Sequence, residues 1–221
     1  MTTTTAPLPG SKRARTCDQL LVAAQDLLLE QSATALGIRQ VTSRAGMVHA
    51  TFYNYFADIE ALLANLADLI FAAHAGLVAP LREGLDDPAA IFAAITRQTL
   101  RTIVEVPGLG RLIFDSGLPI DRFLTGLRAA MQADVAEGVR LGRFTVPDAA
   151  IATSMVTGAL IGLGLDLHRG LVPPAAIEAT TARLLELLGL ARPAAEALAG
   201  QAVAFRPAPS LPLRWLDLRL S

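Results

Sequence analysis

Apolar residues recur at intervals of three and four along this 221-residue chain, and prolines and glycines divide them into segments of helical length. This spacing is typical of amphipathic helices. The first stripe, in residues 16–31, consists of Leu20, Leu21, Ala24, Leu27 and Leu28. No β-type alternation of useful length appears before the last few residues. The pattern therefore predicts an all-α fold.

Caps and breakers predict where the later helices begin and end. A short helix at residues 38–45 would end at Gly46, and another would follow at residues 48–55. Asp58 is a suitable N-cap for a long helix. Further helices are expected at residues 88–105, 111–115, 119–141, 148–168 and 174–188. Two short helices joined by a turn that contains glycine form the helix-turn-helix pattern.

Composition excludes several classes of protein. The net charge of −1 indicates no particular partner, and the single Cys17 excludes an internal disulfide and a cysteine-based zinc cluster. A mean hydropathy of +0.45 raises the question of a membrane span. The longest uncharged stretch, residues 149–165, is at the lower limit for a span and contains three glycines. We find no second candidate and no signal peptide, and therefore expect a cytoplasmic protein without a membrane partner.

The chain divides into four expected segments. Residues 1–15 form a flexible basic arm, residues 16–57 a three-helix unit, residues 58–191 a larger helical domain and residues 192–221 a proline-rich tail. The tail contains the only tryptophan, Trp215. Its apolar residues could dock on the chain's own core or on a partner subunit, or the tail could be disordered.

The segment from Phe52 to Phe56 holds both tyrosines and four of the eleven aromatic residues. Phe52 and Phe56 share a helix face and would pack inward, so that Tyr53, Asn54 and Tyr55 would point largely outward. One interpretation is a helix that covers a core with tyrosines at its edge. The order of the helices favours another, in which the outward residues read DNA.

These residue types suit a recognition helix. Asparagine can pair with adenine, threonine can contact phosphate or a thymine methyl group, and tyrosine hydroxyls can bind phosphate oxygens. Residues 1–57 carry a net charge of +2, whereas the remainder carries −3. The candidate DNA-binding residues are Arg39, Arg44, His49, Ala50, Thr51, Tyr53, Asn54 and Tyr55.

Residues 16–66 resemble the DNA-binding domain of TetR-type (TetR/AcrR) bacterial transcriptional regulators. The matching features are the alanine and paired leucines of the first helix, the second helix ending in Ala45-Gly46, the motif from Ala50 to Phe56, and the sequence from Glu60 to Leu63. The resemblance implies an N-terminal three-helix helix-turn-helix domain joined to a larger helical ligand-binding and dimerisation domain. It further implies a homodimeric repressor that a small, largely apolar effector releases from a palindromic operator.

The resemblance also implies a dimer interface on the last two helices of the larger domain. Residues 158–162 form a small-xxx-small pattern, which lets helices approach closely in a membrane or in a soluble interface; one marginal span favours the soluble interface. The expected interface residues are Gly158, Gly162, Ile177, Leu184 and Leu188.

The resemblance also implies an effector cavity inside the helices between Asp58 and about Leu141, with residues 107–119 as its expected mouth. The candidate lining residues are Phe71, His74, Phe92, Arg111, Phe114, Phe123, Met131 and His168.

Three departures from the family pattern keep another function open. Val48 replaces the usual serine cap of the recognition helix, Ile59 replaces a lysine and Gly37 replaces a threonine. The alternative is a helical ligand-binding or scaffolding protein with degenerate DNA recognition. An enzyme is not expected, because the three histidines are scattered and no catalytic or metal-binding motif occurs. No cofactor or metal is expected.

Overall fold

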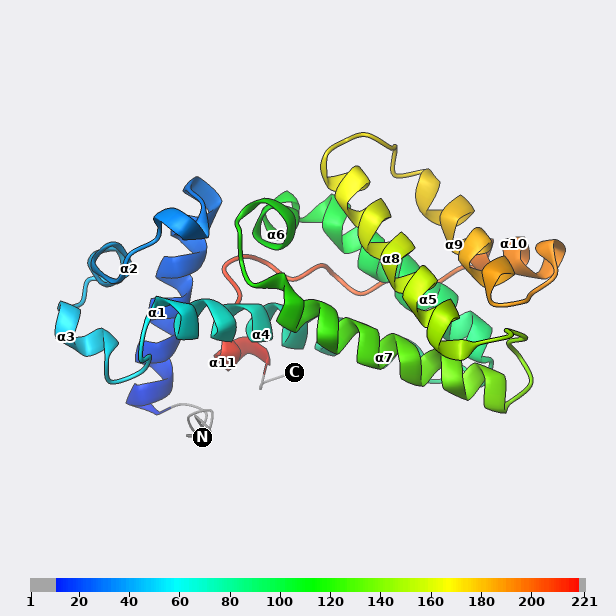
Figure 1. Cartoon of the computed structure of the whole chain (residues 1–221), viewed down its shortest axis with the longest axis horizontal. Coiled ribbons are helices and arrows are strands. Elements are labelled where there is room, and N and C mark those ends of the chain that lie inside the picture. Colours follow the sequence, from blue (N-terminus) through cyan, green and yellow to red (C-terminus); the bar gives the residue numbers. More distant parts are fainter. Residues whose placement is uncertain (1–10, 219–221) are drawn as a thin grey trace. The chain divides into compact units, whose positions relative to one another are not determined.

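The computed structural model describes residues 11–218, and every regular element among them is helical (Figure 1). The predicted all-α fold is therefore confirmed. Contacts divide the chain into two compact units. Unit 1 comprises Met1–Ala73, Arg111–Phe123 and Ser210–Ser221, and unit 2 comprises His74–Gly110 and Leu124–Pro209. Residues 1–10, which include most of the expected flexible arm, lie outside the described residues.

Helix α1 of unit 1 spans Lys12–Glu30 and begins earlier than the sequence predicted. The Ser11 hydroxyl caps it by accepting a hydrogen bond from the Ala14 N–H at 3.1 Å. The assignment of residues 12–15 to a flexible arm is therefore wrong. Their three cationic side chains are exposed on the first turns of a helix.

The core of unit 1 forms where α1 packs against α2, Ile38–Arg44, and α2 packs against α3, His49–Phe52. The first part of α4, Ile59–Val78, also belongs to this unit. Asp58 caps α4 as predicted, because its carboxylate accepts the Ala61 N–H at 2.7 Å. The buried side chains include Leu20, Leu21, Leu28, Val41, Phe52, Phe56, Leu62 and Leu66.

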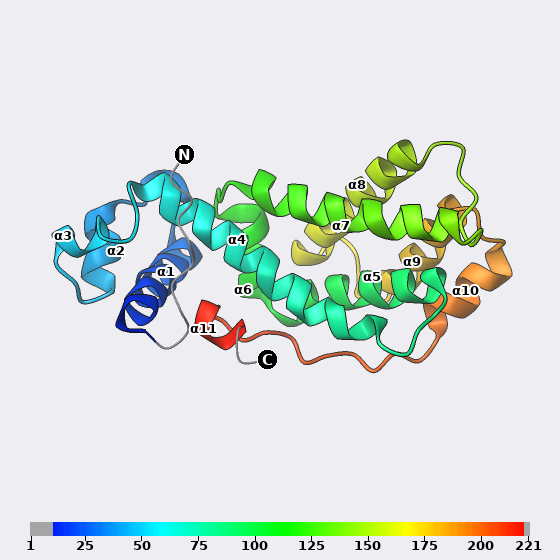
Figure 2. The same cartoon turned by 90° about the horizontal axis from the view of Figure 1, so that it is seen from below.

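Unit 2 is organised around α5, which packs against α8, α9 and α10. Asp87 caps α5 by accepting the Ala89 N–H, as the Asp-Pro sequence predicted. Helices α9 and α10 lie side by side (Figures 1 and 2). The elements that contribute to this unit are the end of α4, η2 (Ala79–Arg82), α5 (Pro88–Glu105), α6 (Pro107–Gly110), most of α7 (Ile120–Arg140), α8 (Ala149–His168), α9 (Ala176–Leu187) and α10 (Arg192–Gly200).

The expected proline-rich tail contains a helix that the sequence analysis missed. Helix α10 begins at Arg192, with Pro193 in its first turn, where proline is compatible with a helix because no intrahelical N–H bond is lost. Ala195 and Ala199 of this helix are buried. The chain then runs extended and ends its described part with the short helix α11, Trp215–Leu218, against α1. The tail therefore docks on its own chain.

Two helical segments are long and apolar enough to cross a membrane on length and composition alone. They are residues 59–82 and α8, and only α8 was expected from the sequence as a candidate span. Fewer than half of the residues in the most apolar window of each are buried within the chain. Core helices of helical domains meet the same criterion, so this is weak evidence for a membrane span.

The expected dimer residues fall into two groups. Ile177, Leu184 and Leu188 lie in the core of their own chain, so a surface on α9 would have to use other residues. Their apolar side chains face inward because α9 packs on α5 and α10. Gly158 and Gly162 are exposed, and a Cβ added to either would meet no atom within 4 Å.

Candidate nucleic-acid interface

The turn between α2 and α3 is built from residues 45–48. Gly46 has a φ of +68°, which a residue with a side chain adopts only at a cost. The Met47 N–H donates to the Thr42 carbonyl at 2.8 Å, and the Gly46 N–H donates to the Ser43 carbonyl. These bonds close the end of α2 and turn the chain directly into α3. The result is a helix-turn-helix of the kind that the sequence predicted.

Helix α3 is shorter than expected. It covers His49–Phe52, and the residues from Tyr53 to Tyr55 form a turn instead of a second helical turn. Val48 stands at the N-cap but has no side-chain acceptor for the free N–H groups at the start of the helix. The prediction of a helix over residues 48–55 is therefore too long by a turn.

The aromatic residues after this turn divide as the sequence predicted. Phe52 and Phe56 are buried, with ring centres 5.6 Å apart. The Tyr53 side chain is exposed over about half of its surface, and Asn54 is also exposed. Tyr55 is only half-buried, so it is a less accessible candidate. The buried pair anchors the segment while Tyr53 and Asn54 remain free to meet a ligand.

The other candidates on α3 extend the same exposed surface. His49 and Ala50 are exposed, and Thr51 is half-buried. The imidazole of His49 meets the ring of Tyr53 edge to face, with ring centres 5.4 Å apart. Because the two residues are four apart, this contact aligns their side chains on one side of α3.

Arg13 is a component of this surface that the sequence analysis assigned to the flexible arm. Its Nη2 donates a hydrogen bond to the Asn54 carbonyl oxygen at 2.9 Å, and its guanidinium lies 5.1 Å from the centre of the Tyr55 ring. Arg13 thus joins the first turn of α1 to the segment that follows α3. Only the fold brings these positions together, since 41 residues separate Arg13 from Asn54.

The two arginines of α2 differ in their surroundings. Arg39 is exposed. Arg44 forms a bidentate ion pair with Glu30 of α1, with N–O distances of 3.0 and 2.8 Å. Hydrogen bonding within this pair lowers the pKa of Glu30 and raises that of Arg44. The pair is exposed to solvent, so it holds Arg44 only weakly, and phosphate could compete for the guanidinium.

The exposed cationic groups of unit 1 include more residues than Arg39 and Arg44, the two cations expected from the sequence to bind DNA. Lys12, Arg13 and Arg15 are exposed on the first turns of α1, and Arg39 is exposed on α2. Glu30 forms its ion pair with Arg44. No group of three or more His, Cys, Asp or Glu residues that could hold a metal ion occurs within residues 11–218. A polar and positively charged surface beside a helix-turn-helix suits the DNA backbone.

These features define the class of helix-turn-helix DNA-binding proteins with a second helical unit. The family model described as "Bacterial regulatory proteins, tetR family" matches residues 20–66. The model described as "Tetracyclin repressor-like, C-terminal domain" matches residues 87–201. The chain belongs to the TetR family of bacterial transcriptional regulators.

Solved structures of other regulators agree with this family. RolR in complex with resorcinol is 29% identical, with a TM-score of 0.66, and the match covers 90% of this chain and 98% of RolR. The fatty acid degradation regulator FadR from Bacillus halodurans is 18% identical, with a TM-score of 0.62, over 89% of this chain and all of FadR. NalD, the secondary repressor of the MexAB-OprM multidrug efflux pump in Pseudomonas aeruginosa, is 16% identical, with a TM-score of 0.63.

The match to NalD covers 80% of this chain and 97% of NalD, and like FadR it supports the fold alone. No curated protein sequence matches the chain significantly. The matched family and the solved neighbours are transcriptional regulators and not enzymes.

The expected effector residues do not gather in one unit. Phe71, Arg111, Phe114 and Phe123 belong to unit 1, and His74, Phe92, Met131 and His168 belong to unit 2. None of the eight lines the cavities of unit 2 described below. The eight residues therefore lie in two different units, and the sequence did not show which residue belongs to which unit.

In unit 1, the rings of Phe71 and Phe123 pack edge to face at 6.2 Å. Arg111 opens a π-helical turn, η3, Arg111–Asp115, in place of the ordinary short helix that was expected. Its Nε atom is buried without a hydrogen-bond partner. π-Helical turns are frequent at functional sites.

In unit 2, Phe92 is fully buried against Phe144, with ring centres 6.2 Å apart, and is a core residue. Met131 is also buried. The His168 imidazole lies so close to Gly110 that a Cβ there would be 2.4 Å from Nδ1. Partial burial lowers the pKa of His74 to about 4, so its imidazole is neutral near pH 7.

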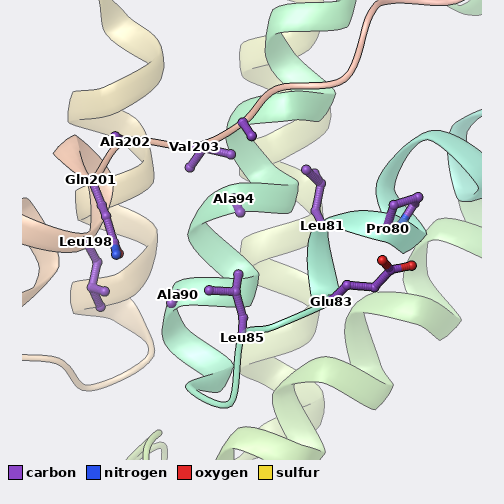
Figure 3. A pocket seen from close by; sticks show the side chains of 11 residues that line it. Pro80, Leu81, Glu83, Leu85, Ala90, Ala94, Leu198, Gln201, Ala202 and Val203 are labelled. Carbon is purple, nitrogen blue, oxygen red and sulfur yellow. The ribbon is translucent and has the colours of Figure 1, made fainter.

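The described part of unit 2 includes cavities that the sequence did not predict, of which three are considered. The one in Figure 3, of about 200 Å³, lies between η2, α5 and the segment after α10. Its walls are largely apolar, with Glu83 and Gln201 as polar groups. A second, of about 440 Å³, is lined by residues that include Arg97, Arg101 and Phe205. A third, of about 240 Å³, lies beside Asp86 and Asp134. Most of these residues have ordinary core or surface spacing, which explains why the sequence did not reveal them.

Proposed function

We propose that this protein is a homodimeric, sequence-specific regulator, acting in the cytoplasm as a repressor that a small effector releases from a palindromic operator. The observation that carries the proposal is the exposed Tyr53-Asn54 pair directly after α3, beside the cations of α1 and α2. Asn54 supplies an amide for a base edge and Tyr53 a hydroxyl for a phosphate. Arg39, Arg44, His49, Ala50, Thr51 and Tyr55 are proposed as further contacts.

An apolar stripe along α8 supports dimerisation. Ile151 and Met155 are exposed over more than half of their surface, and Gly158 and Gly162 continue the same row at helical spacing. Exposed large apolar residues in a row beside small ones favour close packing of a second helix. We propose that α8 meets its counterpart in a second copy. Two-fold symmetry would present two recognition segments to the two halves of a palindrome.

A small, largely apolar effector is proposed to bind the helical part of the chain. The cavities of unit 2 measure about 200 to 440 Å³, which suits a molecule of one or two rings. RolR, the neighbour at 29% identity, has been solved with resorcinol. A ligand that binds the operator-free state more tightly would lower DNA affinity by linkage.

A gel shift with the DNA upstream of the protein's own coding region tests the DNA-binding role. The wild type is expected to give a specific shift that weakens as salt rises, because phosphate contacts release counterions. Replacing Tyr53 and Asn54 together with alanine should weaken binding at least tenfold, since a good base contact contributes about 1–3 kcal/mol. Thr34→Ala, at an exposed position outside α2 and α3, is the matched control and should leave binding unchanged.

Equal affinity of the double variant and the wild type would contradict the assignment of the recognition segment. Absence of any specific shift by the wild type would favour the alternative, a helical ligand-binding protein with degenerate DNA recognition.

Replacing Val48 with serine is expected to strengthen the helix-turn-helix. Val48 is 72% exposed at the N-cap of α3 and makes no side-chain cap hydrogen bond. A serine hydroxyl can accept one of the free N–H groups, which typically stabilises a helix by about 1 kcal/mol. Chemical denaturation should show a gain for Val48→Ser that Val48→Ala lacks, together with tighter operator binding. Equal stability of the two variants would show that capping does not limit α3.

A further inference from the structure

Two buried glutamines, one in each unit, hold the C-terminal segment in the same way. Gln98 of α5 donates from Nε2 to the Arg206 carbonyl at 3.2 Å and accepts the Arg206 N–H at 2.8 Å. Gln25 of α1 donates to the Leu213 carbonyl at 2.8 Å and accepts the Leu213 N–H at 2.7 Å. Each glutamine therefore satisfies both backbone groups of one tail residue, as a neighbouring strand would.

Additional contacts reinforce the anchor in unit 2. The nearly buried Arg97 donates from Nη1 to the Gln201 carbonyl at 2.6 Å. Its guanidinium and that of Arg101 lie 5.2 and 4.8 Å from the centre of the Phe205 ring. Cations over an aromatic face attract it, and partial desolvation strengthens that attraction. Residues 201–206 are therefore held by several groups of α5.

The anchor in unit 1 is also built from buried groups. Asp18 is 1% exposed, and its carboxylate accepts the N–H groups of Trp215 at 3.1 Å and Leu216 at 3.2 Å. These free N–H groups lie at the start of α11, so Asp18 caps that helix although it is almost 200 residues away in the sequence. The Leu213 side chain is itself buried.

The spacing of Asp18 and Gln25 explains how one face of α1 receives the tail. They are seven residues apart, which places both on the same side of the helix. If the tail undocked, water could replace its hydrogen bonds to the side chains of Asp18 and Gln25.

We propose that residues 201–218 form a strap that docks in cis on the Asp18–Gln25 face of α1 and restrains the DNA-binding unit. Seven residues separate the two glutamine-bound positions, so these can lie at most roughly 25 Å apart however the units are arranged. The chain passes between the units within α4, after Gly110, within α7 and again in the strap. The strap acts on the same helix whose first turn carries Arg13, which contacts Asn54.

Limited proteolysis of the full-length chain tests the strap. Trypsin can cut after Arg214, within the docked segment, whereas the bond after Arg206 precedes Pro207 and resists cleavage. Gln25→Ala should accelerate cleavage after Arg214 at least tenfold, because both hydrogen bonds to Leu213 are lost. Gln19→Ala, at an exposed position of the same helix, is the control and should cleave as the wild type does.

Hydrogen exchange provides a second readout that does not depend on the protease. The amides of Leu213, Trp215 and Leu216 should exchange at least tenfold faster in Gln25→Ala than in Gln19→Ala, while the core of α5 remains protected. Equal cleavage and exchange in the two variants would overturn the strap. Protection that disappears when the wild type is diluted would show instead that the tail docks on a second copy.

The consequence for DNA rests on the proposed function. If the strap preorganises the DNA-binding unit, Gln25→Ala should bind operator several-fold more weakly than Gln19→Ala. Equal affinity would overturn the restraining role even where proteolysis confirms docking. Failure of the wild type to bind DNA at all would concern the proposed function, and the proteolysis result would still decide whether the strap exists.

Discussion

Replacing Gly189 with alanine is expected to destabilise the protein by more than about 3 kcal/mol. Gly189 follows α9 with a φ of +97°, a conformation that residues with a side chain rarely adopt. A Cβ there would also lie 2.4 Å from the Thr145 carbonyl oxygen. That backbone cannot move aside easily, because the Thr145 N–H donates to the Leu188 carbonyl at 2.9 Å. Conformational strain and a backbone clash therefore add.

Gly142 offers a matched control in the same unit. It follows α7 with a φ of +69°, but a Cβ there would meet no atom within 4 Å. Gly142→Ala should therefore cost only about 1 kcal/mol, the penalty of the backbone conformation alone. Chemical denaturation monitored by circular dichroism would measure both variants. Similar losses for the two would show that the contact with Thr145 relaxes.

Acidification from pH 7 to pH 5 is expected to remove about 2 kcal/mol of stability through His74 alone. Burial lowers the pKa of His74 from 6.5 to about 4. The unfolded chain therefore binds more protons than the folded chain between these values. Stability consequently falls as the pH falls through 6.5 and levels off below about 4. Denaturation at a series of pH values would measure the loss.

His74→Leu should remove most of this pH dependence, whereas Asp18→Asn should retain it. Burial raises the pKa of Asp18, so the folded chain binds a proton at this carboxylate more readily than the unfolded chain does. Asp18 therefore makes the fold more stable as the pH falls, which is opposite to the effect of His74. Burial by itself would raise the pKa of Asp87, but hydrogen bonds from Arg143 and from nearby N–H groups lower it. Asp87 therefore affects the stability mainly at lower pH. Parallel pH profiles for the wild type and His74→Leu would contradict the burial of the neutral imidazole.

The helix-turn-helix was predictable because its signals are local. The turn glycine at 46, the phenylalanines at 52 and 56, and the cap at Asp58 each act on residues within one or two turns. Spacing alone therefore placed Tyr53 and Asn54 on the outside of the core. The end of α3 was wrong by about one turn, because Phe52 and Phe56 have the spacing of a helix face although residues 53–55 between them form a turn.

Other boundaries depended on signals that have two meanings. Serine, lysine and arginine at residues 11–15 suit a disordered arm as well as a capped first turn, and the cap of α1 favours the helix. Proline breaks a helix interior but fits a first turn, so Pro193 began α10 where an irregular tail was expected. The cavities of unit 2 join residues from separate helices, and no local pattern marks them.

By itself, the sequence determined the helical fold and the outward direction of the DNA-reading residues, because both follow from periodicity within single helices. Only the tertiary structure decided that Asp18 and Gln25 are buried, because polar residues on a helix are ordinarily exposed to solvent. They are buried because residues 213–216, which follow 188 to 198 positions later in the sequence, return to α1. There the tail backbone forms hydrogen bonds with the side chains of Asp18 and Gln25. Burial of a polar residue depends on what packs against it, and that partner is set by the path of the whole chain.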